Sequence, residues 1–498
     1  MQYISTRGQS RPVSAAEALL TGLAPDGGLY LPESFPATAA VSPFTEPGLT
    51  YQQLASRILK LFLSDYTEAE LEACIRHAYG GNFTSPAVTP VTMVGEKLGF
   101  LELWHGPTCA FKDLALQLLP RLLTVAARKQ RFDREIILLV ATSGDTGKAA
   151  LEGFKDVPGT KVIVFYPEDG VSAVQKRQMV TQEGTNTYVV GVTGNFDQAQ
   201  AGVKALFTDE EFQQEMAAAG KTFSSANSIN WGRLVPQLVY YFKAWCDLCQ
   251  NHGLAPDATF NIVVPTGNFG NILAAYYGKK LGLPVHKLIC ASNRNNVLTD
   301  FIRTGEYNRN RRFYQTLSPS MDILVSSNLE RLLFDLAGAD PAQVRAYMDQ
   351  LREKGSYRLA AAERERLQEE FWAGYADEAE TTAAIRRVYE RYHYLIDPHT
   401  AVGYKVYQDY LEATGDDRPT IIAATASPFK FNYGVAQAVL GPEAAETPDE
   451  FALMAKLAAA TGVTPPAVLA GLQDKPVRHQ RVIAPVAMAE TVRTILGL

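Results

Sequence analysis

The residue best suited to covalent chemistry is Lys112, which lies in a segment that can form a turn before an apolar helix. The segment reads His105-Gly106-Pro107-Thr108-Cys109-Ala110-Phe111-Lys112-Asp113. A lysine attacks an aldehyde and transfers protons only when its amine is partly neutral, and apolar neighbours favour the neutral form. Lys112 is therefore a candidate Schiff-base lysine, with an ordinary solvent-facing lysine as the alternative.

A second segment lies between a predicted strand and a predicted helix. It reads Ala141-Thr142-Ser143-Gly144-Asp145-Thr146-Gly147. Beyond the carboxyl ends of strands in open α/β sheets, hydroxyls and the N–H groups of a helix N-terminus bind anions. We expect this loop to hold a phosphate or carboxylate, unless it is only a turn capped by Asp145 or Thr146. A nucleotide-binding loop is disfavoured because the segment is too short and Lys148 is not followed by Ser or Thr.

Two further segments could bind oxyanions. Pro265-Thr266-Gly267-Asn268-Phe269-Gly270-Asn271 also follows a predicted strand, and its two glycines allow backbone N–H groups to turn inward as an anion cradle. In the segment from Ser224 to Arg233, amide side chains and a guanidinium suit a dianionic phosphate. A plain glycine turn and an N-cap are the respective alternatives. Two anion cradles and one candidate lysine together indicate a phosphorylated cofactor and a phosphorylated substrate.

The elements that must position these segments follow an α/β pattern. From residue 135 onward, short strands that are apolar on both faces alternate with glycine-containing turns and helices, which predicts a largely parallel sheet covered by helices. The clearest strands are expected at residues 136–140, 162–165, 188–190, 262–264, 288–290 and 421–424. Residues 1–95 are expected to be mainly helical. Residues 329–410 are rich in Glu, Arg, Ala and Leu at helical spacing, and we expect them to form an all-helical insertion.

Composition limits the remaining possibilities. The 498 residues suggest two or three domains, and 47% hydrophobic residues, 20% charged residues and a net charge of -6 are typical of a globular protein that does not bind nucleic acid. The N-terminus lacks a signal-like apolar core and no apolar run is long enough for a membrane span, so we expect a cytoplasmic protein. Cys246 and Cys249 form a C-x-x-C pair within an apolar helix pattern and are interpreted as buried cysteines; no metal site is predicted.

The combined motifs resemble those of threonine synthases, specifically the longer microbial and fungal branch of these fold-type II pyridoxal-phosphate (PLP) enzymes. Matching segments occur in the family's order from about Gly22 to Lys430. They are residues 105–108 with 111–113, 141–147, 225–230, 267–270 and 397–402. The sequence differs from the family pattern at Ser427, where relatives commonly carry histidine, and at Trp231-Gly232 before Arg233.

The resemblance implies a role for individual residues. Lys112 would bind PLP as a Schiff base and move protons. The cofactor phosphate would be bound by Gly267, Asn268, Phe269, Gly270 and Asn271. Asp145 would lie near the 3'-oxygen of PLP, and Thr425 near its pyridine nitrogen. The carboxylate and phosphate of the substrate would be bound by Thr142, Ser143, Thr146, Asn227 and Arg233.

The resemblance also implies a fold and an activity. We expect a tryptophan synthase β-like fold with an N-terminal region at 1–95, a large PLP domain at 96–130 and 226–498, and a small α/β domain at 131–225. The expected reaction converts O-phospho-L-homoserine and water to L-threonine and phosphate, in a monomer without nucleic-acid or membrane partners. A phospho-lyase or dehydratase on the same scaffold, and a non-catalytic PLP-binding homologue, are the alternatives. Asn227 with Arg233 argues against a plain dehydratase.

Overall fold

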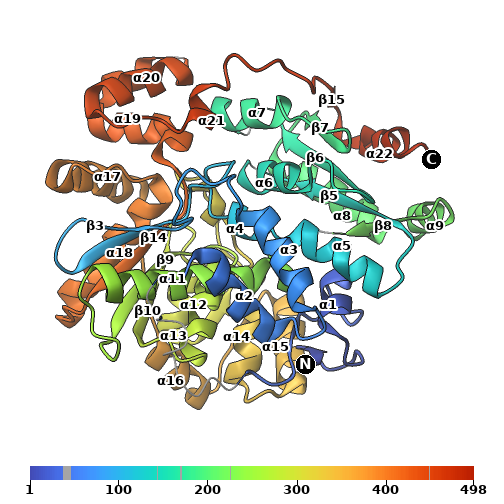
Figure 1. Ribbon diagram of the computed structural model, residues 1–498, viewed down its shortest axis with the longest axis horizontal. Helices are drawn as coiled ribbons and strands as arrows, with labels where there is room; N and C mark the ends of the chain where they lie inside the picture. Colours follow the sequence, from blue (N-terminus) through green and yellow to red (C-terminus); the bar gives the residue numbers. More distant parts are fainter. Residues whose placement is uncertain (37–45, 47, 143, 169–170, 225, 448) are drawn as a thin grey trace.

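Two largely parallel sheets, each covered by helices, form the framework of the molecule (Figure 1). They are described from a computed structural model, which covers residues 1–36, 46, 48–142, 144–168, 171–224, 226–447 and 449–498. All six strands that the sequence predicts are present in these sheets. The expected α/β fold class, with mostly parallel sheets, is therefore confirmed.

The larger sheet has six strands in the order β13-β10-β9-β14-β4-β3. Only β3 runs antiparallel to its neighbour. The central strands are buried over almost their whole length, as expected for strands that are covered on both faces. The strand bounds are β3 Val91–Met93, β4 Leu98–Glu102, β9 Phe260–Pro265, β10 Val285–Ser292, β13 Phe371–Tyr375 and β14 Thr420–Ala424.

Helices from distant parts of the chain cover this sheet. Helix α18 packs against β9, β10, β13 and β14, while α12 and α13 pack against β10. Helix α11 is buried from Pro236 to Leu248 and lies against α12. Cys246 is buried in this helix as predicted, whereas Cys249 is only half-buried, and all five cysteines are free thiols. The helix bounds are α10 Trp231–Leu234, α11 Pro236–Asn251, α12 Gly270–Lys280, α13 Val297–Thr304 and α18 Pro398–Thr414.

The smaller sheet has five parallel strands in the order β15-β7-β6-β5-β8. Its edge strand β15 and helix α22 come from the C-terminus, and Met488, Val492 and Leu496 of α22 enter its apolar cluster. The predicted domain boundaries place these C-terminal residues in the large domain, but they pack on the smaller sheet. The bounds are β5 Glu135–Ala141, β6 Thr160–Pro167, β7 Thr187–Val192, β8 Lys221–Ser224, β15 Val482–Ile483, α6 Asp145–Phe154, α7 Ala173–Val180, α8 Phe196–Thr208, α9 Glu210–Ala218 and α22 Met488–Leu496.

The N-terminal region is mainly helical, as predicted. Capping boxes start two of its helices, with the Thr50 and Thr67 side chains accepting the N–H groups of Gln53 and Glu70. A short antiparallel ribbon of β1 and β2 precedes them, and α1 packs against α5 of the central part of the chain. The bounds are β1 Tyr3–Ser5, α1 Ala15–Thr21, β2 Tyr30–Pro32, α2 Tyr51–Phe62, α3 Glu68–Tyr79, α4 Asp113–Leu116 and α5 Leu119–Lys129.

The prediction of an all-helical insertion at residues 329–410 is wrong in two places. β13 is the edge strand of the larger sheet, and β12 pairs with β11. Both are short strands between charged helices, so helical periodicity on either side obscured them. The remaining bounds are β11 Glu306–Asn308, η2 Pro319–Met321, α14 Leu329–Leu336, α15 Pro341–Lys354, β12 Ser356–Arg358, α16 Ala361–Glu370, α17 Glu378–Tyr392, η3 Pro428–Phe431, α19 Asn432–Leu440, η4 Pro442–Glu446, α20 Glu450–Thr461, α21 Ala467–Ala470 and η5 Pro485–Ala487.

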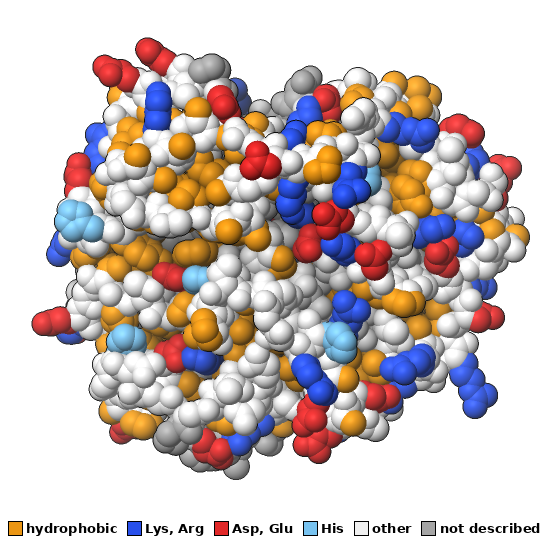
Figure 2. All heavy atoms as spheres, turned by 45° about the horizontal axis from the view of Figure 1, so that its top comes forward, with side chains coloured by type: hydrophobic (Ala, Val, Ile, Leu, Met, Phe, Trp, Pro, Cys, Tyr) orange, Lys and Arg blue, Asp and Glu red, His pale blue; other side chains and the backbone are white. Residues whose placement is uncertain are grey.

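The surface carries charges of both signs. On the face drawn in Figure 2, acidic and basic side chains are interspersed, and a notch separates two lobes at the upper edge. No helix in the described ranges combines the length and apolar character that a membrane crossing requires.

Candidate active site

Asp113, the residue after Lys112, stabilises the turn that carries Lys112. The Asp113 carboxylate accepts hydrogen bonds from the Thr108 N–H (2.8 Å) and the Thr108 hydroxyl (2.7 Å). Cys109 adopts a positive φ of 57°, and a side chain at Gly106 would lie 2.6 Å from Asp113. Asp113 and Gly106 thus fold the segment into a tight loop that ends at the first turn of α4, with Lys112 at its N-cap.

This loop is fastened to the chain that leaves β14. The Phe111 N–H donates to the Thr425 carbonyl (2.8 Å), and the Ser427 N–H donates to the Cys109 carbonyl (3.1 Å). Ala110 and Ala426 form an isolated bridge between these hydrogen bonds. The structure therefore places Thr425 beside the lysine loop.

Lys112 lies in a nearly dry environment between two polar groups. Its side chain is 12% exposed; its Nζ donates to Ser320 Oγ at 3.2 Å and lies 3.8 Å from Asp145 Oδ2. Burial lowers the pKa of Lys112 to about 8, an effect that Asp145 opposes and that the positive charges of Lys430 and Arg233 strengthen. A substantial fraction of this amine is neutral at mildly alkaline pH, as a nucleophilic lysine requires.

Asp145 is the first residue of α6, and its carboxylate is shared among several donors. Oδ1 accepts from Lys430 Nζ (2.8 Å) and Gln175 Nε2 (3.0 Å), and Oδ2 accepts from Ser320 Oγ (3.4 Å). Burial would raise the pKa of Asp145, but the ammonium groups of Lys430 and Lys112 outweigh it and hold this pKa below its ordinary value. Asp145 is thus a buried, ionised carboxylate that faces the lysine.

The glycine loop lies on the turn that carries Ser320. A Cβ atom at Gly267 would lie 2.7 Å from the Ser320 carbonyl oxygen, so only glycine fits there. Phe269 adopts a left-handed φ of 62°, and Gly270 begins α12. Asn328 fixes the loop by donating its N–H and its Nδ2 to the Asn268 carbonyl, both at 3.1 Å. The loop therefore ends at the N-terminus of α12, where an anion is favoured.

Asn271 adds a directed donor in the first turn of α12. Its Oδ1 accepts hydrogen bonds from Tyr240 (2.6 Å) and Tyr241 (2.5 Å), both on the buried helix α11. With the amide oriented in this way, the buried Nδ2 has no acceptor among the described residues. An unsatisfied buried amide is costly, and an anion bound at the loop would satisfy it.

Close packing at Gly267 leads to a measurable expectation. Gly267→Ala should push the backbone of Ser320 and Met321 away, lowering the free energy of unfolding by about 1–3 kcal/mol and weakening cofactor binding. Urea unfolding of the cofactor-free protein and a cofactor titration measure these two effects. Gly434→Ala in α19 is the matched control, because the nearest atoms would lie at an ordinary 3.7 Å. Equal behaviour of both variants would contradict the close contact.

Arg233 is a buried guanidinium on α10, 3% exposed. One of its terminal nitrogens donates to the Ala226 carbonyl, while Nε has no partner among the described residues. No carboxylate of the described chain forms an ion pair with it, and burial lowers the pKa of Arg233 to about 10. A buried cation with free donor capacity is arranged to receive an anion.

The other predicted substrate ligands occupy different positions. The Thr142 hydroxyl oxygen accepts the N–H groups of Gly144 and Gly147, both at 3.0 Å, so it shapes the loop before α6. Thr146 is half-buried in the first turn of α6, and Asn227 is exposed between β8 and α10. Ser143 lies outside the described residues.

Several residues of the site were not predicted from the sequence. Ser320 contacts Lys112, and Gln175 contacts Asp145. Neither residue belongs to a recognisable sequence motif, so sequence analysis did not identify them. Lys430 could have been identified from the sequence, because it is a lysine between two phenylalanines shortly after a buried strand. His399, known only as part of a motif, accepts the Ser320 N–H at its Nε2 (3.2 Å) and contacts Asp397 through Nδ1 (2.6 Å).

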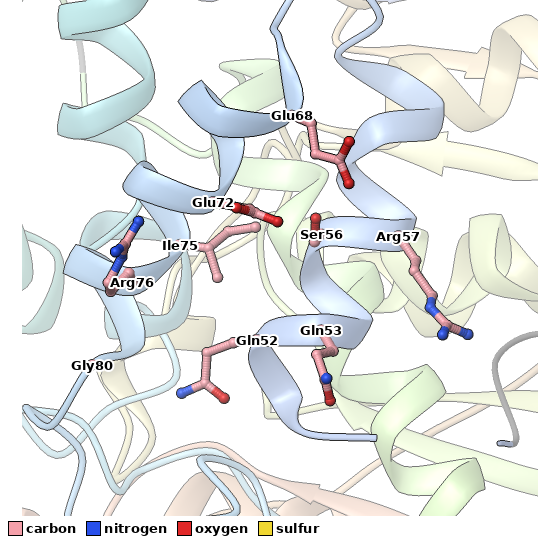
Figure 3. Close-up of a pocket in the computed structure, with 9 residues that line it drawn as sticks. All are labelled: Gln52, Gln53, Ser56, Arg57, Glu68, Glu72, Ile75, Arg76 and Gly80. Atoms are coloured by element: carbon pink, nitrogen blue, oxygen red, sulfur yellow. The ribbon is translucent and has the colours of Figure 1, made fainter. Parts of the chain in front are cut away.

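A separate hollow lies between α2 and α3 and contains none of these groups (Figure 3). Apart from the buried Ile75, its lining consists of half-buried or exposed residues that are mostly polar or charged. It offers no buried titratable group, and the chemistry is therefore assigned to the surroundings of Lys112. The lining residues are Gln52, Gln53, Ser56, Arg57, Glu68, Glu72, Ile75, Arg76 and Gly80.

Comparison with known proteins identifies matching family models, similar sequences and similar structures. Three family models match the chain: "Threonine synthase N terminus" at residues 2–79, "Pyridoxal-phosphate dependent enzyme" at residues 88–425, and "Threonine synthase, C-terminal" at residues 400–495. Threonine synthase of Pseudomonas aeruginosa is 39% identical over 89% of this chain and 91% of its own length. The crystal structure of PLP-bound threonine synthase from Brucella melitensis has a TM-score of 0.88 and 37% identity, with all of both chains covered.

A longer relative is also similar. The human protein named threonine synthase-like 1 is 41% identical over 87% of this chain, and the match spans 59% of the human protein.

Proposed function

This chain belongs to the threonine synthase family of PLP-dependent enzymes, and we propose that it converts O-phospho-L-homoserine and water to L-threonine and phosphate. The observation that carries this proposal is the convergence of a largely buried lysine with a lowered pKa, a glycine loop at a helix N-terminus, and a buried arginine that pairs with no carboxylate of the described residues. Such a site suits two phosphorylated molecules, a cofactor and a substrate.

We propose that Lys112 binds PLP covalently and that Gly267, Asn268, Phe269, Gly270 and Asn271 bind its phosphate. The unsatisfied Nδ2 of Asn271 and the backbone at the start of α12 support this placement. Asp145 would face the polar ring substituent of the cofactor, and the Thr425 hydroxyl its pyridine nitrogen. A hydroxyl at that nitrogen leaves it unprotonated and moderates electron withdrawal.

When bound, PLP supplies an electron sink that stabilises negative charge next to the amino group of the substrate. The chemistry left to the protein is proton transfer. Lys112 Nζ would remove protons from the α- and β-carbons in turn. One proton would be returned to the γ-carbon once the phosphate has left, and the other to the α-carbon after water has added at the β-carbon. Because the Lys112 amine would act in several steps, the rate depends on its position. Ser320 and Asp145 contact the amine and would hold it in place.

We propose that Arg233, with Asn227, binds the substrate phosphate, and that Thr142, Ser143 and Thr146 bind its carboxylate. Lys430 and Arg233 place two positive groups near Lys112, and Asp145 and Asp113 place two carboxyl groups there. Lys430 is paired with Asp145, so Arg233 is the cation best placed to bind an anion. After the phosphate has left, the guanidinium would keep it bound, where it could assist the attack of water. Approach of the small domain to the large one would exclude bulk water from the reaction.

One assay distinguishes this activity from related ones. Phosphohomoserine turnover should release threonine and inorganic phosphate in equal amounts, with little keto acid, when all three products are measured together. Stoichiometric keto acid and ammonia would instead identify a phospho-lyase. Cofactor binding without any product would identify a non-catalytic homologue.

We further propose that the protein acts in the cytoplasm as a monomer. The free thiols, four of them buried, fit a reducing compartment. The proposed division is an N-terminal region at 1–95, a large domain at 96–130 and 226 to about 480, and a small domain at 131–225 completed by the C-terminal residues. Light scattering after gel filtration would test the monomer, and a dimer mass would contradict it.

A further inference from the structure

Lys430 is a fully buried lysine, 0% exposed, in η3 of the large domain. Its Nζ donates to the Thr108 carbonyl (2.9 Å) and pairs with Asp145 Oδ1 (2.8 Å). We propose that Lys430 is a positioning residue: it holds one oxygen of Asp145, so that the carboxylate does not close onto Lys112. The role in the reaction rests on the proposed function of Lys112.

The two oxygens of Asp145 are engaged unequally. Oδ1 has two donors at 2.8 and 3.0 Å, from Lys430 and Gln175. Oδ2 has Ser320 Oγ at 3.4 Å and Lys112 Nζ at 3.8 Å, and the second distance is too long for a hydrogen bond. The carboxylate therefore contacts Lys430 closely, whereas its ion pair with Lys112 is longer and lacks a hydrogen bond.

Without Lys430, the strongest partner available to Asp145 would be Lys112. A direct ion pair in a dry site would hold the amine protonated, which opposes both cofactor attachment and proton transfer. A buried lysine also costs free energy unless it is paired, and an apolar side chain would fill the same space without that cost. The pair therefore fits a role in the chemistry of the site better than a role in stability.

The pair also joins the two domains. Asp145 begins α6 on the smaller sheet, whereas Lys430 and Thr108 belong to the segments around the larger sheet. Both the Lys430–Asp145 pair and the approach of Asp145 to Lys112 are therefore contacts between the two domains. The charged or titratable groups that surround Lys112 and this pair are Asp145 on α6, Lys430 on η3, Arg233 on α10, Asp113 on α4 and His399 on α18.

The test measures the basicity of the Lys112 amine in the cofactor-free protein. Trinitrobenzenesulfonate reacts with neutral amines, so the pH dependence of its labelling of the Lys112 peptide gives a midpoint, expected near pH 8 in the wild type. In Lys430→Met, Asp145 can pair with Lys112, and the midpoint should rise by about one unit or more. An unchanged or lowered midpoint in a folded Lys430→Met protein would overturn the proposal.

Two further variants distinguish loss of the Lys430–Asp145 contact from general destabilisation of the site. Destabilisation lets water reach Lys112, and this would raise the midpoint of its labelling in any destabilised variant. Loss of Lys430 raises the midpoint only while Asp145 is present to pair with Lys112. In the double variant Asp145→Asn/Lys430→Met, the midpoint should therefore lie at or below the wild-type value. Lys148→Met removes another buried lysine, paired with Glu152 at 3.0 Å, and should leave the midpoint unchanged.

The double variant is also the test if Lys430→Met does not fold, because it removes both charges of the Lys430–Asp145 pair together. A raised midpoint in the double variant would then overturn the proposal. Since labelling requires neither cofactor nor substrate, it is independent of the proposed function. If the cofactor were attached to another lysine, the function assigned to Lys112 would fail while the shift in its midpoint would stand.

Discussion

Lys112→Ala should reduce turnover of phosphohomoserine by at least about 10³-fold, because the variant loses both the site of cofactor attachment and the group that moves protons. Borohydride reduction of the wild-type enzyme should fix the cofactor on the peptide that contains Lys112, and the same treatment of the variant should fix none. The visible absorbance of the protein-bound cofactor should also be lost.

The variant should remain folded. Asp145, which contacts Lys112, keeps its closer partner Lys430, so no buried carboxylate is left unpaired. Lys148→Met provides the control, since Lys148 is equally buried in α6 but pairs with Glu152. Cofactor trapped on any lysine other than Lys112 in the wild type would overturn the site assignment.

Arg233→Met should raise the KM for the phosphorylated substrate by about 10–100-fold, the effect of losing charge-assisted hydrogen bonds worth about 1.5–3 kcal/mol. The free energy of unfolding of the ligand-free variant should not fall, because the guanidinium is buried without a carboxylate partner among the described residues. Inorganic phosphate should raise the Tm of the wild type and have a smaller effect on the variant.

A second buried arginine gives a matched control. Arg331 is fully buried, and it donates to the Tyr30 carbonyl (3.0 Å), Asn328 Oδ1 (2.6 Å) and the Ile229 carbonyl (2.6 Å). Arg331→Met leaves these acceptors unsatisfied and should destabilise the protein by about 2–4 kcal/mol. If Arg233→Met were equally destabilising and did not change the response to phosphate, Arg233 would be structural and another residue would bind the anion.

The sequence predicted the parts of the site that follow local rules. Strands such as β5 and β9 are buried on both faces, so they appear as continuous apolar runs, and ligands bind beyond the carboxyl ends of such strands. The segments after them, with Asp145 and Gly267, could therefore each be expected to bind a ligand. The sequence did not show that β5 and β9 belong to different sheets. Lys112 could be proposed as a Schiff-base lysine from its apolar neighbours and from the turn residues before it.

The contacts between these segments could not be predicted from the local sequence. Ser320 is 208 residues from Lys112, and its position depends on a turn that packs on Gly267 and on His399. Lys430 lies far along the chain from Asp145, and an isolated lysine is ordinarily exposed. The edge strands β13 and β15 were missed because one lies between charged helices and the other has two residues.

The pairing of β15 with β7 has a consequence for synthesis of the chain. The neighbouring strands of the smaller sheet are complete once residue 224 has left the ribosome, but β7 acquires its outer partner only from residues 482–483, and the cover provided by α22 comes later still. During most of translation, the nascent chain therefore presents an unpaired strand edge beside uncovered apolar side chains, a surface that chaperones bind and that can initiate aggregation.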